Sequence, residues 1–174
     1  TTIEMIKRFK AAGTLVSFDV NFRGNLWTGE EAKECIEQIL PYVDIFFCSE
    51  DTARLTFKKT GTAREMMKSV TEESPISIVA STQRIVHSPK SHTFGSIIYD
   101  ARKDIYYEEE PYRDIDVVDR IGSGDAYISG ALYGLLTSNF DCEKAVRYGN
   151  ATSAVKNTIP GDLPSSDLEE IETI

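Results

Sequence analysis

The sequence has 174 residues, of which 41% are hydrophobic and 27% are charged. This length predicts a single domain over residues 1–174, and the composition excludes wholesale disorder. Lys and Arg number 19 against 28 Asp and Glu, a formal net charge of −9 that disfavours binding to nucleic acid or an anionic membrane. We expect neither a signal peptide nor a membrane span, and the three separated cysteines predict a reduced, cytoplasmic protein.

Three short apolar runs in the first half of the sequence predict β-strands, at residues 15–20, 44–48 and 76–80. Amphipathic patterns lie around and between these runs. They predict a first helix that ends at Gly13, a second from Thr28 to near Pro41, and two more over 50–57 and 62–70. Strands that alternate with amphipathic helices are typical of a parallel α/β sheet.

Polar residues at four positions predict where helices begin. Thr28 and Glu31 have the spacing of a capping box, in which each side chain bonds the backbone amide of the other residue. Ser49 and Asp141 are predicted to cap the helices that follow them. The stretch Ser166–Glu169 has the same capping-box pattern and predicts a terminal helix.

The second half of the sequence changes character after the third strand. Apolar runs at 94–99 and 105–107 flank a charged turn and predict an antiparallel hairpin. The last third is helical, and its first helix carries an apolar stripe at helical spacing, formed by Tyr127, Ile128, Ala131, Leu132, Leu135 and Leu136. A second row of small residues, Ala126, Gly130 and Gly134, allows close approach of a neighbouring element.

The segment Asp119–Asp125, hereafter the signature loop, reads Asp-Arg-Ile-Gly-Ser-Gly-Asp and directly precedes that helix. Its glycines allow a tight turn and close approach of a ligand to the backbone. The amides of Gly122 to Asp125 would then point out of a helix N-terminus and form an anion hole. A plain loop with a helix cap is the alternative interpretation, because short Gly-rich caps are common.

Asp125 lies in the first turn beside this anion hole. A carboxylate beside a bound anion is repulsive unless it takes a proton from a nucleophile that attacks the anion. A hydroxyl attacking a phosphoryl group fits these parts, with the amides stabilising the transferred charge. The segment is neither a Walker A loop nor a dinucleotide fingerprint, because the glycine and lysine spacing of both motifs is absent.

The signature loop resembles the Asp-Thr-x-Gly-Ala-Gly-Asp motif of the ribokinase-like (PfkB) family of carbohydrate kinases. Further blocks resemble 2-keto-3-deoxygluconate kinases in order and spacing, and they are Ser17–Arg23 with Leu26 and Trp27, Val117–Arg120, Gly149–Ala151 and Thr158–Asp162. The resemblance runs from about residue 10 to 165. It implies a three-layer α/β/α ribokinase-like sheet, mostly parallel with an antiparallel hairpin, that lacks the N-terminal half and lid of the family.

The resemblance assigns the phosphoryl-transfer site to the signature loop. It implies that Asp125 is the general base and that the backbone of Gly122, Ser123 and Gly124 holds the γ-phosphoryl group of ATP, with Mg²⁺ accompanying the nucleotide. Ser123 replaces the alanine of the family motif. Asn150 and Gly161 fall in the stretch that lines the adenine pocket in the family. From its position alone, Asn150 could equally be a polar group on a helix surface.

Asp19, Asn21 and Arg23 follow a predicted strand at its carboxyl end, where open α/β sheets bind ligands. Arg23 could bind a carboxylate or a phosphate through two hydrogen bonds. A 2-keto-3-deoxy sugar acid offers the first and ATP offers the second, and the sequence leaves both open. A solvated turn with an Asx cap is the interpretation without a ligand.

Two cation sites are implied less directly. Asp119 occupies a family position that contacts a monovalent cation or supports the structure. The family's Asn-x-x-Glu element, which organises Mg²⁺, is absent, and residues 49–52 read Ser-Glu-Asp-Thr instead. Glu50 and Asp51 either take over part of that role or serve as first-turn helix charges.

Nothing in the sequence matches the N-terminal half of the family, so we expect a piece of a longer kinase with an uncovered sheet edge that favours self-association into a homo-oligomer. Three functions are consistent with the residues. The first is an ATP-dependent kinase for 2-keto-3-deoxygluconate. The second is another PfkB-type kinase that acts on fructose or ribose. The third is an inactive fragment that at most binds nucleotide.

Overall fold

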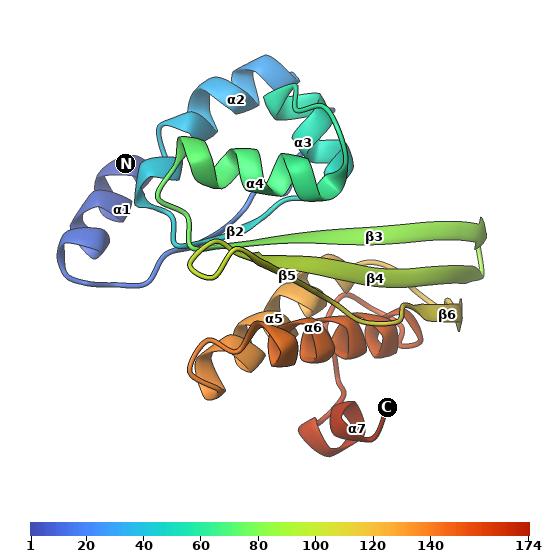
Figure 1. Ribbon diagram of the computed structural model, residues 1–174. Helices are drawn as coiled ribbons and strands as arrows, with labels where there is room; N and C mark the ends of the chain where they lie inside the picture. Colours follow the sequence, from blue (N-terminus) through green and yellow to red (C-terminus); the bar gives the residue numbers. More distant parts are fainter. The chain divides into compact units, whose positions relative to one another are not determined.

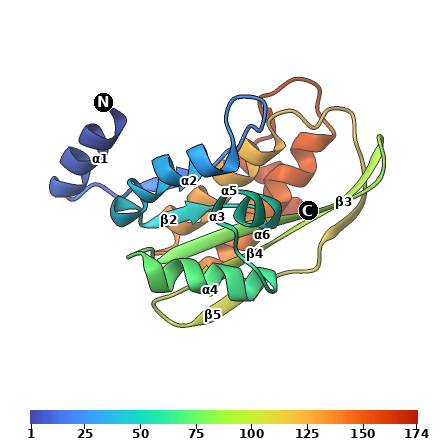
Figure 2. The ribbon, with the colours of Figure 1, turned by 90° about the horizontal axis from the view of Figure 1, so that it is seen from above.

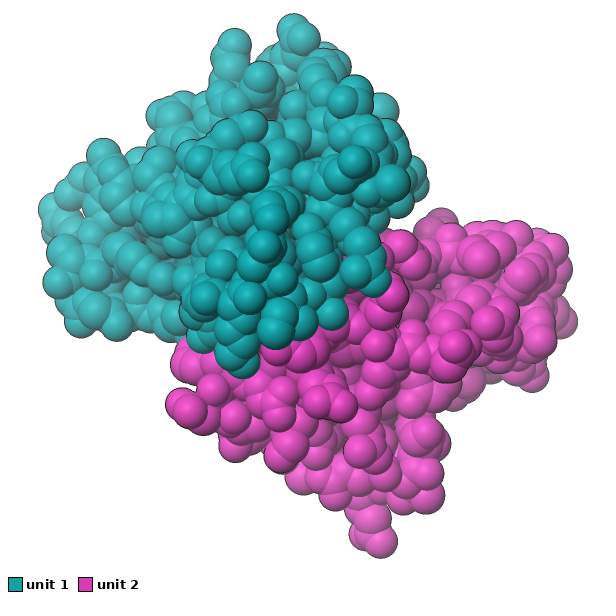
Figure 3. Space-filling model, in the orientation of Figure 1, with its two compact units in different colours: residues 1–81, 99–106 teal, residues 82–98, 107–174 magenta.

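A computed structural model describes residues 1–174. Contacts within the chain divide it into two compact units, which are coloured separately in Figure 3. Unit 1 contains residues 1–81 and 99–106, and unit 2 contains residues 82–98 and 107–174. None of the helices combines the length and the apolar character that crossing a bilayer requires.

Unit 1 contains the alternating strands and helices that the first half of the sequence predicts (Figure 1). Its elements in chain order are α1 (Thr2–Ala11), β1 (Ser17–Asp19), α2 (Gly29–Glu37), the 3₁₀ turn η1 (Leu40–Tyr42), β2 (Ile45–Phe47), α3 (Glu50–Phe57) and α4 (Ala63–Glu73). The strands β3 (Ile78–Ser88), β4 (Ser91–Asp100) and β5 (Ile105–Glu108) contain residues of both units.

Unit 2 contains the helices of the last third of the sequence. Its remaining elements are β6 (Tyr112–Asp116), α5 (Ser123–Thr137), α6 (Cys142–Asn157) and α7 (Leu168–Thr173). Helices α5 and α6 lie side by side, as Figures 1 and 2 both show.

The strands form one mixed sheet in the order β1-β2-β3-β4-β5, with β6 paired to β4. β1 and β2 are parallel, as are β2 and β3, whereas β4 and β6 are antiparallel. In register, Asp19 lies opposite Phe47, which lies opposite Ala80. The carboxyl ends of β1 and β2 therefore meet at one edge of unit 1, and the predicted α/β class is confirmed.

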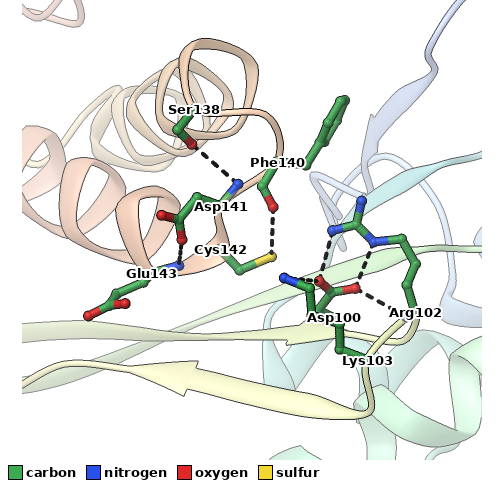
Figure 4. A network of polar contacts seen from close by, with 8 residues as sticks. All are labelled: Asp100, Arg102, Lys103, Ser138, Phe140, Asp141, Cys142 and Glu143. Carbon is green, nitrogen blue, oxygen red and sulfur yellow. Dashed lines mark hydrogen bonds and ion pairs between the residues drawn. The ribbon is translucent and has the colours of Figure 1, made fainter.

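Most of the predicted helix caps are confirmed. The Thr28 amide donates to Glu31 at 2.8 Å while the Thr28 hydroxyl accepts from the Glu31 amide at 3.2 Å, which completes the capping box. Ser49 caps α3, and Asp141 caps α6 by accepting from an amide of its first turn (Figure 4). The predicted cap at Ser166 is wrong by one residue, because Asp167 accepts from the Glu170 amide at 2.9 Å instead.

Two features of the sheet were not predicted from the sequence. β3 continues to Ser88 and joins β4 through a two-residue turn, although its outer residues are exposed and carry no apolar alternation. β6 was also missed, since its five residues are mostly polar. The β4–β6 pairing is irregular between His92 and Phe94, and Asp114 has a left-handed φ of 51°, both consistent with a β-bulge.

The row of small residues on α5 is the surface on which α6 packs. A Cβ on Gly130 would lie 2.5 Å from the carbonyl oxygen of Tyr148. On Gly134 it would lie 2.8 Å from the Cα of Ala145. Both positions require glycine, so the close approach predicted from the sequence is confirmed.

The turn between β4 and β5 is closed by a buried carboxylate (Figure 4). Asp100 is fully buried, and Arg102 donates to both of its oxygens at 2.8 Å from Nε and Nη2. Lys103 lies 3.7 Å away. Burial raises the pKa of Asp100, but the bidentate Arg102 pair outweighs it and holds the pKa below its usual value.

His92 on β4 is a buried histidine with an unsatisfied nitrogen. It is 4% exposed, and its Nδ1 has no hydrogen-bond partner. Burial, followed by the charges of Arg84, Arg120 and His87, lowers the pKa of His92 in the folded chain. The folded state therefore binds fewer protons at this site than the unfolded state, in which a histidine titrates near about 6.5.

We predict that His92 makes the chain less stable as pH falls. The contribution of neutral His92 to the free energy of unfolding is complete above the pKa of His92 in the unfolded state. It declines as pH drops below about 6.5 and levels off below the pKa of His92 in the folded state. Urea unfolding of the wild type and His92→Gln between pH 7.5 and 5 measures this. Equal pH dependence in the wild type and His92→Gln would contradict the assignment.

Candidate active site

The signature loop turns sharply into α5 at Gly122. This residue has a left-handed φ of 78° and is the N-cap of the helix. A Cβ at this position would lie 1.9 Å from the carbonyl oxygen of Asp162, far inside any real contact distance. Glycine is therefore required both by the backbone conformation and by the closeness of the 158–162 loop.

The turn leaves an open helix N-terminus, as predicted. The Ser123 amide donates to the carbonyl of Arg120 at 3.2 Å, so one of the four predicted anion-hole amides is already engaged. The amides of Gly122, Gly124 and Asp125 have no acceptor within the chain. Asp125 is exposed in the first helical turn, and its carboxylate forms no hydrogen bond or ion pair. Backbone amides and a carboxylate, all without partners in the chain, thus lie together at one helix N-terminus.

Asp119 fixes the start of the signature loop. One carboxylate oxygen accepts from the Ile121 amide at 2.9 Å, and the other accepts from the Gly161 amide at 3.1 Å. The Ile121 hydrogen bond, followed by the Gly161 hydrogen bond and the Lys156 charge, holds the pKa of Asp119 below its usual value. The structure therefore brings Gly161, which has a left-handed φ of 88°, to the signature loop.

A buried polar support beneath the loop was not predicted from the sequence. Lys156 is fully buried at the end of α6, and its ammonium donates to the carbonyls of Asp119 at 3.1 Å and Ile159 at 3.0 Å. Ser153, one turn earlier, donates to the carbonyl of Ser123 at 3.1 Å. Both residues fall on the same face of α6 as Asn150 and Asn157, which are also buried, and the sequence alone does not distinguish this polar face from an exposed one.

Asn150 lies in the core of unit 2. It is fully buried on α6, and its Oδ1 accepts from the Ser96 hydroxyl of β4 at 2.7 Å. Its Nδ2 has no partner. The alternative interpretation of Asn150 as a surface residue is therefore wrong.

The other predicted site residues belong to unit 1. Asp19 ends β1, and one of its oxygens accepts from the Asn21 amide at 3.2 Å, an Asx turn in which Asn21 has a left-handed φ of 41°. Arg23 is exposed in the following loop. Burial, followed by the Asp19 charge, raises the pKa of the Cys48 thiol at the end of β2 to about 12. Cys48 is consequently a protonated thiol, and its Sγ donates to the carbonyl of Ser49 at 3.5 Å.

Glu50 and Asp51 form the first turn of α3, at the carboxyl end of β2. Glu50 is paired with Arg54 at 2.7 Å, whereas Asp51 is exposed and has no ion pair. No group of three or more His, Cys, Asp or Glu side chains is arranged to hold a metal ion by itself. The contacts of Glu50 are those of a helix-stabilising charge.

A cavity in unit 1 and a groove in unit 2 lie away from the signature loop. A cavity of about 360 Å³ in unit 1 is lined by α2, α3, α4 and β2, including Phe46, Phe57 and Lys59. In unit 2, a groove of about 240 Å³ runs along α5, α6 and α7 past Tyr133 and Tyr148. Neither contains a residue of the signature loop.

Comparison with known proteins places the chain in a family. The family model described as pfkB family carbohydrate kinase matches residues 1–167. The chain belongs to the pfkB family. Among solved PfkB-fold structures, 2-dehydro-3-deoxygluconokinase from Thermotoga maritima matches with a TM-score of 0.91 and 28% identity, over 98% of this chain and 52% of that one.

Two further relatives bear on substrate and nucleotide. A protein named 2-dehydro-3-deoxygalactonokinase from Haloferax volcanii is 30% identical over all 174 residues and 51% of its own length. A putative ribokinase II from E. coli, solved in complex with ATP and Mg²⁺, has a TM-score of 0.74 at 26% identity, over 97% of this chain and 50% of that one. The chain thus spans about half the length of the relatives it matches, as expected from the sequence.

The two glycines of the signature loop should respond differently to alanine. Gly122→Ala is predicted to cost at least about 2 kcal/mol, because the new Cβ meets the Asp162 carbonyl and φ is left-handed. Gly124→Ala, whose Cβ meets nothing within 4 Å, should stay within about 1 kcal/mol of the wild type. Urea unfolding measures both, and equal stabilities would refute the close approach of Gly122 to the 158–162 loop.

Proposed function

We propose that this chain carries the nucleotide-binding and catalytic part of an ATP-dependent sugar-acid kinase. The observation that supports this most directly is the left-handed turn at Gly122, which leaves three amides and the carboxylate of Asp125 without partners at one helix N-terminus. A structural helix cap would use these groups, whereas a phosphoryl-transfer site needs them open. Membership of the pfkB family supports the same chemistry.

In the proposed reaction, Asp125 takes the proton of a sugar hydroxyl as its oxygen attacks the γ-phosphorus of ATP. The new O–P bond forms while the bond from the γ-phosphorus to the β–γ bridging oxygen breaks, and ADP leaves. The amides of Gly122, Gly124 and Asp125 stabilise the negative charge of the transferring group. The Ser123 amide is not available to the phosphoryl group, because it donates to the carbonyl of Arg120.

We place the nucleotide along the signature loop and the 158–162 loop. Val118, Ile121 and Leu163 in or beside these segments are 61%, 63% and 75% exposed, apolar surface that suits a base. Gly161 is held in the same place by Asp119, which we assign a positioning role rather than a monovalent-cation site. Asn150 acts from the core by holding α6 against Ser96 of β4.

Mg²⁺ would enter with the nucleotide, where it neutralises charge on the β- and γ-phosphates. Such ions are usually held by one or two carboxylates together with substrate phosphates, so a dedicated cluster of protein ligands is not required. At the start of α3 in unit 1, Glu50 is paired with Arg54, and Asp51 has no ion pair. The residues present fit a phosphate-borne Mg²⁺.

We assign the acceptor to the 2-keto-3-deoxy sugar acids, most directly 2-keto-3-deoxygluconate. Arg23 is exposed and has no acidic partner, so its guanidinium is open to the carboxylate of such a substrate. The two relatives named for 2-dehydro-3-deoxy sugar acids support this class. Fructose and ribose are the neutral acceptors against which the assignment is tested.

Asp125→Asn should abolish turnover without loss of nucleotide binding. Removing the base is expected to lower kcat by about 10² to 10⁴, because the amides that hold the phosphates are unchanged. Titration of the 174-residue chain with Mg-ATP, followed by thermal unfolding, should show the same saturable rise in Tm for the wild type and the variant. Turnover near the wild-type level, assayed in the intact kinase, would refute the role of Asp125.

Arg23→Ala separates acidic from neutral acceptors. If Arg23 binds the substrate carboxylate, KM for 2-keto-3-deoxygluconate should rise about tenfold or more while KM for fructose stays unchanged. A matched rise in KM for ATP with every acceptor would instead assign Arg23 to the phosphates. Arg54→Ala, in the same unit and paired with Glu50, is the control for loss of a surface arginine.

A further inference from the structure

Lys156 is a buried cation that makes no direct ion pair. It is fully buried, and both of its hydrogen bonds are to neutral carbonyls, those of Asp119 and Ile159. Its ammonium makes no ion pair with a carboxylate. Burying a charge is costly unless an opposite charge is close, and carbonyl groups at a helix C-terminus offset only part of that cost.

The carboxylate of Asp119 acts on Lys156 through space, but its oxygens form their hydrogen bonds with backbone amides. Asp119 uses its two oxygens to accept from the Ile121 and Gly161 amides, and only its carbonyl bonds Lys156. The positive charge therefore lies directly under the signature loop, three residues before the Gly122 turn. The open amides and the buried ammonium both favour an anion at this part of unit 2, whereas the carboxylates of Asp119 and Asp125 oppose one.

We propose that Lys156 is a positioning residue that supplies positive charge beneath the anion hole, where its ammonium attracts the phosphate chain of the nucleotide. The inference rests on the proposed function and names a residue that sequence motifs did not single out. It also explains why a lysine, rather than an apolar residue, occupies a fully buried position at the end of α6. A neutral side chain there would pack without the cost of burying a charge.

A purely structural role for Lys156 makes a different prediction. Its two hydrogen bonds join the start of the signature loop to the 158–162 loop, so a purely structural loss should be smaller in a variant that keeps a hydrogen-bond donor than in one that keeps none. A charge acts in proportion to the charge of its partner. The loss in affinity should therefore grow with the number of phosphates on the ligand.

The experiment compares the wild type with Lys156→Gln and Lys156→Met, using adenosine, AMP, ADP and ATP with Mg²⁺ present throughout. Glutamine retains one hydrogen-bond donor without the charge, and methionine retains the apolar stem alone. Lys144 is an exposed lysine on the same helix, so Lys144→Met is the control for the loss of one positive charge from the chain. Calorimetry gives the affinities, and thermal unfolding shows that each variant is folded.

We expect ATP affinity to fall about tenfold or more in both Lys156 variants, ADP affinity to fall less, and adenosine affinity to stay unchanged. Equal losses for all four ligands, or no loss for ATP, would overturn the inference and leave the proposed function intact. A wild-type chain that binds none of the four would overturn both.

A second measurement is needed because a buried lysine can be essential for folding. In the wild type, the Nζ resonance of Lys156 is followed by NMR during separate titrations with ATP and adenosine. The inference requires a shift of that resonance with ATP that is much larger than the shift with adenosine. Equal shifts with the two ligands would contradict it.

Discussion

Gly122 can lie against the Asp162 carbonyl only because it has no Cβ, and the rest of the candidate site follows from that contact. The left-handed turn points the first amides of α5 outward and leaves Asp125 in the first helical turn. Asp119 then holds the same two segments together from the other side, through the Ile121 and Gly161 amides. Two backbone segments that are distant in sequence thereby lie against each other beside the open amides of α5.

The sequence predicted the parts of this site that depend on local residue chemistry. Glycine, serine and aspartate in the signature loop indicated an open helix N-terminus, and threonine and glutamate at capping spacing located helix starts to the residue. The terminal cap was displaced by one position, because Ser166 and Asp167 are both good caps and local sequence does not choose between them. The α/β class followed from the alternation of strands and helices.

The features that the sequence could not supply depend on tertiary contacts. The outer half of β3 and the whole of β6 lack apolar alternation, since their pairing with β4 rather than their own burial keeps them extended. Lys156 and Asn150 look like ordinary surface residues of a helix until α6 is packed against β4, β6 and α5. A buried charge or amide is visible only when its surroundings are known.

The glycines on α5 have an effect beyond the packing of two helices. Gly130 and Gly134 let the backbone of α6 come into contact with α5, and α6 carries Lys156 and Ser153 to the carbonyls of the signature loop. The distance between α5 and α6 therefore decides whether Lys156 and Ser153 can reach the carbonyls of the signature loop. A methyl group at Gly134, far along α5 from the signature loop, would push against Ala145 of α6 and so displace the side chains of α6 that support the loop.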